Sequence, residues 1–91
     1  MISINNILVP FVDSPSAIGA LKTAVKLCQI HNAKLHVIHV LTEKSNENVL
    51  DRIKEVCTKE NTVFTFIERS GSIHKEITKA EKEIGIDLIV M

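Results

Sequence analysis

The sequence has no excess of charge of either sign. Its 91 residues include 11 lysines and arginines and 11 aspartates and glutamates, which gives a formal net charge of +0. Proteins that bind nucleic acid or anionic membrane surfaces through basic patches carry a positive excess. The charge balance therefore argues against both classes of partner.

Cysteine is scarce as well. Cys28 and Cys57 are the only two, and neither belongs to a CxxC pair or to a spacing typical of metal ligands. Both fall within apolar helical patterns, and cysteine is among the residue types most often fully buried. We therefore expect two buried free thiols.

Long apolar runs are absent too. No run approaches the roughly 20 residues that a membrane-spanning helix needs. Residues 1–11 lack the basic segment of a signal peptide, and Asn5, Asn6 and Pro10 interrupt their apolar pattern. These features predict a cytoplasmic protein with no membrane partner, and the length predicts a single domain, 1–91.

Several motifs of enzymes and metal sites are missing. The sequence contains no GxxxxGK, HxGH or GxSxG pattern, and its glycines stand alone. His36 and His39 form an HxxH pair, but residues three apart on a strand point to opposite faces, which disfavours a shared metal ion. We expect no catalytic residue, no metal ligand and no enzymatic activity.

The sequence does contain an alternation of strand and helix patterns. Apolar or alternating stretches predict strands at 4–12, 34–41, 62–69 and 86–91. Apolar residues three and four positions apart predict helices at 15–32, 49–60 and 72–84. Asp13 or Ser14 can cap the first helix, and Gly85 suits a left-handed cap at the end of the third. This order predicts a doubly wound α/β fold with a parallel sheet.

Four motifs, in this order, resemble the universal stress protein (UspA-like) family. They are Ile7-Leu8-Val9-Pro10 leading to Asp13-Ser14, the strand ending in His39-Val40, the Gly71 turn before the third helix, and the strand 86–91. The resemblance spans essentially all 91 residues. It implies a three-layer α/β sandwich of the adenine nucleotide alpha hydrolase-like, Rossmann-like kind, with about four of the family's five strands and three of its four helices.

The resemblance also implies a function. Many members bind ATP or AMP at the carboxyl ends of the strands, and the family serves in stress response and signalling. The motifs assign five residues to such a cofactor site. Pro10, Phe11 and Asp13 would hold the adenosine end, a backbone group of Val40 would read the adenine edge, and Met91 would directly precede the phosphate loop.

Two departures from the family pattern bear on this assignment. Relatives commonly carry the acid two residues after the proline, whereas Phe11 and Val12 here separate Pro10 from Asp13. The family's glycine-rich phosphate loop, last helix and last strand would all follow Met91. We therefore expect ATP or AMP binding by these 91 residues to be weak or absent.

A second hypothesis is a nucleotide-independent interaction module of the same family that works by dimerisation. Strand 86–91 would form an uncovered sheet edge, and such edges pair readily with other chains. A homodimer is therefore expected under both hypotheses. Residues beyond Met91 would discriminate them, because an intact glycine pattern there favours nucleotide binding.

Overall fold

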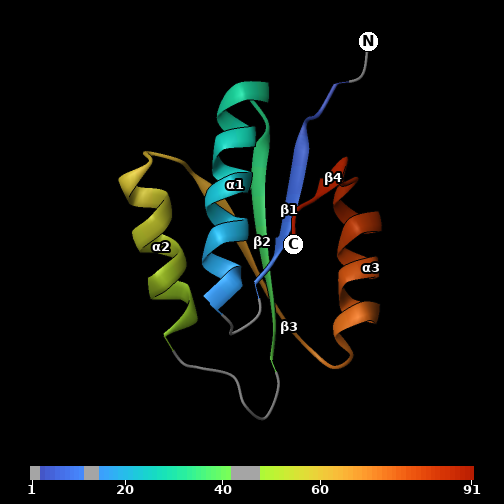
Figure 1. The fold of residues 1–91 in the computed structure, drawn as a ribbon. Coiled ribbons are helices and arrows are strands. Elements are labelled where there is room, and N and C mark those ends of the chain that lie inside the picture. Colours follow the sequence, from blue (N-terminus) through green and yellow to red (C-terminus); the bar gives the residue numbers. More distant parts are fainter. Residues whose placement is uncertain (1–2, 12–14, 42–47) are drawn as a thin grey trace.

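Helices cover both faces of a parallel sheet in the computed structural model of the chain (Figure 1). The structure describes residues 3–11, 15–41 and 48–91. The elements follow one another as β1 (Asn6–Pro10), α1 (Pro15–His31), β2 (Lys34–Leu41), α2 (Val49–Lys59), β3 (Phe64–Ser70), α3 (Ile73–Ile84) and β4 (Leu88–Ile89). The predicted α/β fold and its order of elements are confirmed.

The sheet has the strand order β3-β2-β1-β4, and every pairing is parallel. β1 lies inside the sheet, where Ile7 pairs with both Leu35 and Leu88. Among the described strands, β4 forms one edge, as predicted, and β3 forms the other. α1 and α2 lie on one face of the sheet and α3 lies on the other (Figure 1).

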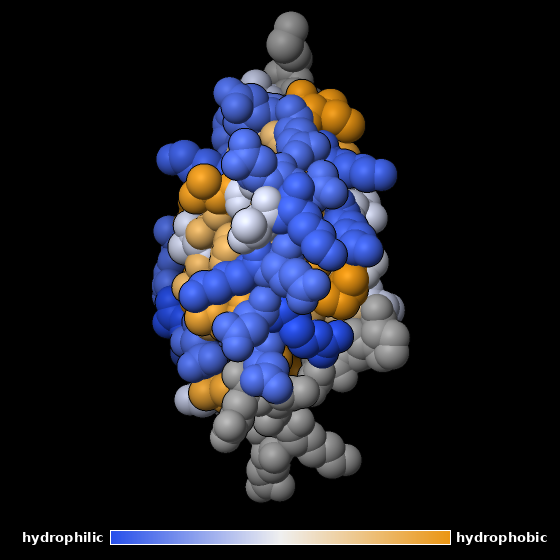
Figure 2. Space-filling model, turned by 90° about the vertical axis from the view of Figure 1, so that its left-hand side faces the viewer, coloured by the Kyte–Doolittle hydropathy of each residue, from blue (hydrophilic) through white to orange (hydrophobic). Residues whose placement is uncertain are grey.

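Two hydrophobic cores follow from the alternation of side chains along the strands. Ile7 and Val9 of β1 face α1 and α2 in the larger core. Leu8 faces α3 in the smaller core, together with Ile38 and Val40 of β2. The same alternation places His36 and His39 on opposite faces, as predicted. Seen from the side of α2, the surface is mainly hydrophilic, with separate apolar patches (Figure 2).

Cys28 and Cys57 are both buried free thiols, as the sequence predicts. They belong to the core between the sheet and the helices α1 and α2. Burial raises the pKa of both thiols, and the neighbouring Cys57 raises the pKa of Cys28 further.

The observed helix ends agree in part with the capping residues that the sequence predicts. Gly85 has φ 77° and its amide donates to the carbonyl of Glu81, so the predicted left-handed cap of α3 is confirmed. Gly71 also has a positive φ, of 126°, in the turn between β3 and α3. The predicted capping residues of α1, Asp13 and Ser14, lie outside the described residues. No helix within the described ranges is long and apolar enough to cross a bilayer.

Candidate functional site

A cavity of about 320 Å³ opens where β1 and β4 end, between the first turns of α1 and α3. Its walls are mostly apolar. β1 contributes Pro10, β4 and the chain after it contribute Ile89 and Met91, and α1 contributes Ala17 and Ala20. Ligands of open parallel sheets generally bind at this carboxyl edge.

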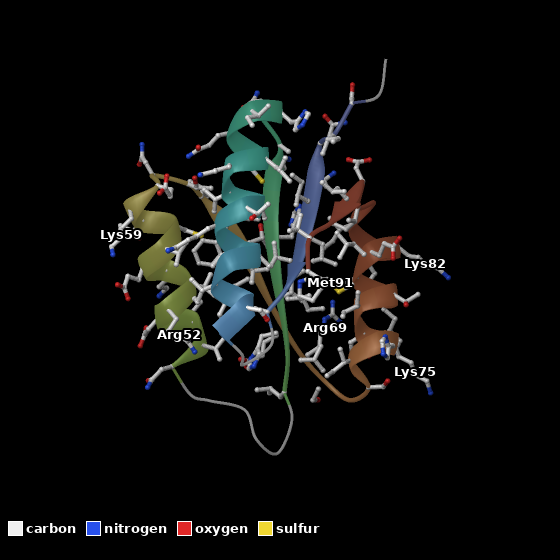
Figure 3. The ribbon with its side chains drawn as sticks, in the orientation of Figure 1. Arg52, Lys59, Arg69, Lys75, Lys82 and Met91 are labelled. Carbon is white, nitrogen blue, oxygen red and sulfur yellow. The ribbon has the colours of Figure 1, made fainter. Side chains whose placement is uncertain are left out.

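Strand pairing brings Pro10 and Met91 together at the cavity. Leu8 pairs with Ile89 in the parallel ladder, and the two site residues each lie two positions further along their chains. They therefore share the sheet face that α3 covers. Pro10 is buried, whereas Met91 is 87% exposed and lies between β1 and α3 (Figure 3).

The structure places the other predicted site residues elsewhere. Phe11 does not line the cavity; its side chain is buried in the core beneath α1 and α2, and its ring centroid lies 6.0 Å from Cζ of Arg52. Val40 shares the sheet face of Pro10 but packs in the smaller core rather than in the cavity wall. Asp13 lies outside the described residues.

α3 supplies cavity residues that the sequence analysis did not assign to a site. Ile73 and Ile77 extend the apolar wall, and His74 and Thr78 lie one helical turn apart on its polar rim. The hydroxyl of Thr78 donates a hydrogen bond to the carbonyl of His74 over 2.8 Å. The apolar stripe of α3 indicated a buried face, but no local pattern indicated that its first turn meets the end of β1.

The face of the sheet opposite α3 holds a second polar feature near the same edge. His39 is 3% exposed, and its Nδ1 lies 3.7 Å from Oε2 of Glu68, beyond hydrogen-bond distance. Nδ1 has no hydrogen-bond partner among the described residues. His39 does not line the cavity. In the described part of the chain, no group of three or more His, Cys, Asp or Glu side chains could hold a metal ion.

The strand order and the cavity at the carboxyl edge define a doubly wound parallel α/β protein. No family model matches the sequence, and no curated protein sequence matches it either. Solved structures do match. A universal stress protein in complex with cAMP superposes with a TM-score of 0.84 at 16% identity, over 97% of this chain and 71% of that chain.

Two further solved structures give the same result. A universal stress protein from Archaeoglobus fulgidus DSM 4304 matches with a TM-score of 0.79 at 28% identity, over 93% of this chain and 31% of that chain. The universal stress protein UspA from Lactobacillus plantarum matches with a TM-score of 0.71 at 24% identity, over 99% of this chain and 77% of that chain. The chain has the fold of the universal stress proteins, and the resemblance stated from its sequence is confirmed.

Proposed function

We propose that the chain belongs to a universal stress protein that binds an adenine nucleotide, ATP or AMP, in the cavity between α1 and α3. The observation that carries this proposal is the meeting of Pro10, at the end of β1, and Met91, two residues after β4, in one apolar cavity at the carboxyl edge. The fold supports it, and one neighbour of the same fold is a complex with cAMP, itself an adenine nucleotide.

The size and chemistry of the cavity support the same ligand class. Small-molecule sites commonly measure about 300–1,000 Å³ and combine apolar walls with a few polar groups. The cavity measures about 320 Å³, and its polar groups are Ser16, His74 and Thr78. Apolar walls suit the faces of a purine, and rim hydroxyls or an imidazole can hydrogen-bond to its edge or to a ribose.

We propose that the bound nucleotide shifts conformation or partner binding and is not turned over. Enzymes of the acyl- or phosphoryl-transfer classes bring a nucleophile, a base and a charge-stabilising group together. The described lining of the cavity holds one imidazole and two hydroxyl side chains, with no carboxylate and no amine. These side chains suit the binding of a ligand better than the catalysis of a reaction.

Isothermal titration with ATP, AMP and cAMP tests the proposal. Ala20 lines the cavity, and the variant Ala20→Phe would fill part of it. We expect this variant to lose nucleotide affinity by roughly tenfold or more. Ile30→Phe, on the same helix at a position that is 74% exposed, is the matched control and should bind like the wild type.

Either of two results would contradict this proposal. If the folded, full-length protein that contains this chain gives no binding heat with any of the three nucleotides, the proposed function is wrong. If Ala20→Phe binds as tightly as Ile30→Phe, the nucleotide site lies outside this cavity. Circular dichroism of each variant excludes loss of folding as the cause.

A second candidate function, nucleotide-independent dimerisation, is favoured by the edge strand β4. Leu88 and Val90 pack against the larger core, and Ile86 and Ile89 pack against the smaller one, yet all four are only partly buried. A strand that is apolar on both faces is typical of a sheet interior. We propose that a second copy of the chain covers this edge in a homodimer.

Sedimentation velocity tests this second candidate. We expect the wild type to sediment as a dimer and Val90→Lys as a monomer, because the lysine would place a charge in the covered edge. Val63→Lys changes a residue that is already 91% exposed at the opposite end of the sheet, and it should remain dimeric. A monomeric wild type would exclude the homodimer.

A further inference from the structure

We propose that the first turn of α1, residues 15–18, is a gate of the cavity that opens about Gly19 to admit the ligand. This inference rests on the proposed function. Ser16, Ala17 and Ala20 line the cavity between α1 and α3, so Gly19 lies within the stretch of α1 that forms this wall. Unwinding of α1 before Gly19 would therefore move this part of the cavity wall.

The packing of the fold does not require a glycine at position 19. Gly19 is exposed, and a Cβ atom at this position would have no packing neighbour within 4 Å among the described residues. Its φ is not among the positive values of the chain, so other residues could adopt its backbone conformation. Glycine in the middle of a helix is less stable than alanine, because it loses more conformational freedom on folding. α1 therefore has a weak point that packing does not explain.

A side-chain hydrogen bond loosens α1 at the same place. The hydroxyl of Thr23 donates to the carbonyl of Gly19 over 3.0 Å. In an α-helix this carbonyl is also the acceptor for the amide of Thr23. Bonds of this kind, from a threonine to the carbonyl four residues earlier, slightly destabilise helices and often bend them. Both the glycine and this bond therefore weaken the junction between the first turn and the rest of α1.

Few apolar side chains hold the first turn to the core. Ala17 contributes a buried methyl group, and Ile18 is only partly buried against the larger core. After Gly19 the attachment is stronger, because Leu21 and Val25 are both 0% exposed in that core. Segments with few buried apolar contacts open at a lower free energy than the whole fold. The first turn can therefore unwind while the rest of α1 stays packed.

Hydrogen exchange of the ligand-free protein tests the gate itself. In an α-helix the amides of residues 19–22, here called the gate amides, donate to the carbonyls of residues 15–18. We expect the gate amides to be less protected than the amides of residues 24–28. Gly19→Ala should raise their protection about fivefold, the factor that corresponds to the usual difference in helix propensity. Lys26→Gly, at an exposed position beyond the gate, is the matched control and should leave their protection unchanged.

Stopped-flow binding of a fluorescent AMP analogue to the full-length protein tests the link to the ligand. If the ligand enters and leaves through the open state, Gly19→Ala should lower the association and dissociation rate constants about fivefold each. Kd should then stay unchanged, because the contacts of the bound ligand are the same. Lys26→Gly should keep both wild-type rate constants. A purely structural role of Gly19 would not slow both rates equally.

The outcomes separate this inference from the proposed function. If the gate amides of the wild type are as well protected as those of residues 24–28, the first turn does not open locally and the inference is wrong. If Gly19→Ala raises their protection but leaves both rate constants unchanged, the turn opens but the ligand does not pass it, and the inference is again wrong. If the full-length wild type binds no nucleotide, the proposed function fails, and the first turn gates no such ligand.

Discussion

Asp87 and Asn6 are joined by two reciprocal hydrogen bonds. The amide of Asp87 donates to the carbonyl of Asn6 over 2.9 Å, and the amide of Asn6 donates to Oδ2 of Asp87, also over 2.9 Å. The same carboxylate oxygen accepts a bond from the amide of Asn5 over 2.8 Å. The paired residues of β4 are only Leu88 and Ile89, so these bonds extend its attachment to β1 toward the start of both strands.

We predict that Asp87→Asn destabilises the fold at neutral pH and that the effect disappears in acid. The amides of Asn5 and Asn6 lower the pKa of Asp87 because they bond to its charged form. A lowered folded-state pKa contributes stability above the unfolded-state value of about 3.9, and this stability is lost as the pH falls through the folded-state pKa. Thermal unfolding midpoints of the wild type and the variant should therefore converge as the pH falls through the lowered pKa of Asp87. Glu81→Gln, at an exposed position of α3, is the control, and an equal effect of both variants would refute the prediction.

We predict that His36 makes the free energy of unfolding depend on pH near neutrality. His36 is 8% exposed, and its Nε2 lies 3.0 Å from Oδ1 of Asn6, which can accept a hydrogen bond from it. Burial lowers the pKa of His36, and the charge of Lys34 lowers it further. The unfolded chain therefore binds more protons between the lowered pKa and about 6.5, so stability should fall as the pH drops through that window.

The variant His36→Gln should remove this dependence. Its amide can still donate to Asn6, but it does not titrate. We expect the free energy of unfolding of the wild type, measured with urea, to fall between about pH 7.5 and about pH 5.5 by at most about 1.4 kcal/mol per pH unit, and the slope for His36→Gln to be flatter. His31→Gln changes an exposed histidine and should keep the wild-type slope; a wild-type slope in His36→Gln would contradict the assignment.

The sequence predicted the interior elements of the fold better than the edges. β2 spans Lys34–Leu41 as predicted, because it is paired on both sides and apolar on both faces. β1 begins at Asn6 rather than at residue 4, because its pairing with β2 begins where Asn6 meets Lys34. β4 keeps two of the six predicted residues, because edge pairing depends on β1 and not on the local apolar pattern.

The sequence predicted only those residues of the candidate site that the parallel strands position. Pro10 ends β1 and Met91 follows the end of the parallel strand β4 by two residues, and their proximity follows from that topology. Phe11 follows Pro10 directly and must face the other side of the sheet, which removes it from the cavity. His74 and Thr78 lie on α3, the helix that connects β3 to β4. No local sequence pattern predicts where that helix packs relative to the end of β1.

Arg69 and Glu83 connect β3 to α3 through an ion pair of 2.9 Å between Nη2 and Oε2. Arg69 lies between the sheet and α3, whereas Lys59 lies on the outer side of α2 (Figure 3). Both members of the first pair are more than a third exposed, so solvent screens their attraction. A double-mutant cycle should give a coupling of about 0.2–1 kcal/mol for this pair and less for Lys59 with Glu55, which are 3.6 Å apart. A stronger coupling between Lys59 and Glu55 would contradict the prediction that the ion pair between β3 and α3 contributes more to stability.

Ile53 and Ile30 provide the sharpest test of the larger core. Ile53 is 0% exposed on α2 and packs in the core between the helices and the sheet, whereas Ile30 is 74% exposed near the end of α1. Truncating a buried isoleucine to alanine leaves a cavity and costs about 2–5 kcal/mol, while exposed positions usually change stability by less than about 0.5 kcal/mol. Urea unfolding of Ile53→Ala and Ile30→Ala should show this contrast. Similar losses in both variants would mean that Ile30 is covered in solution, which would place a partner surface at the end of α1.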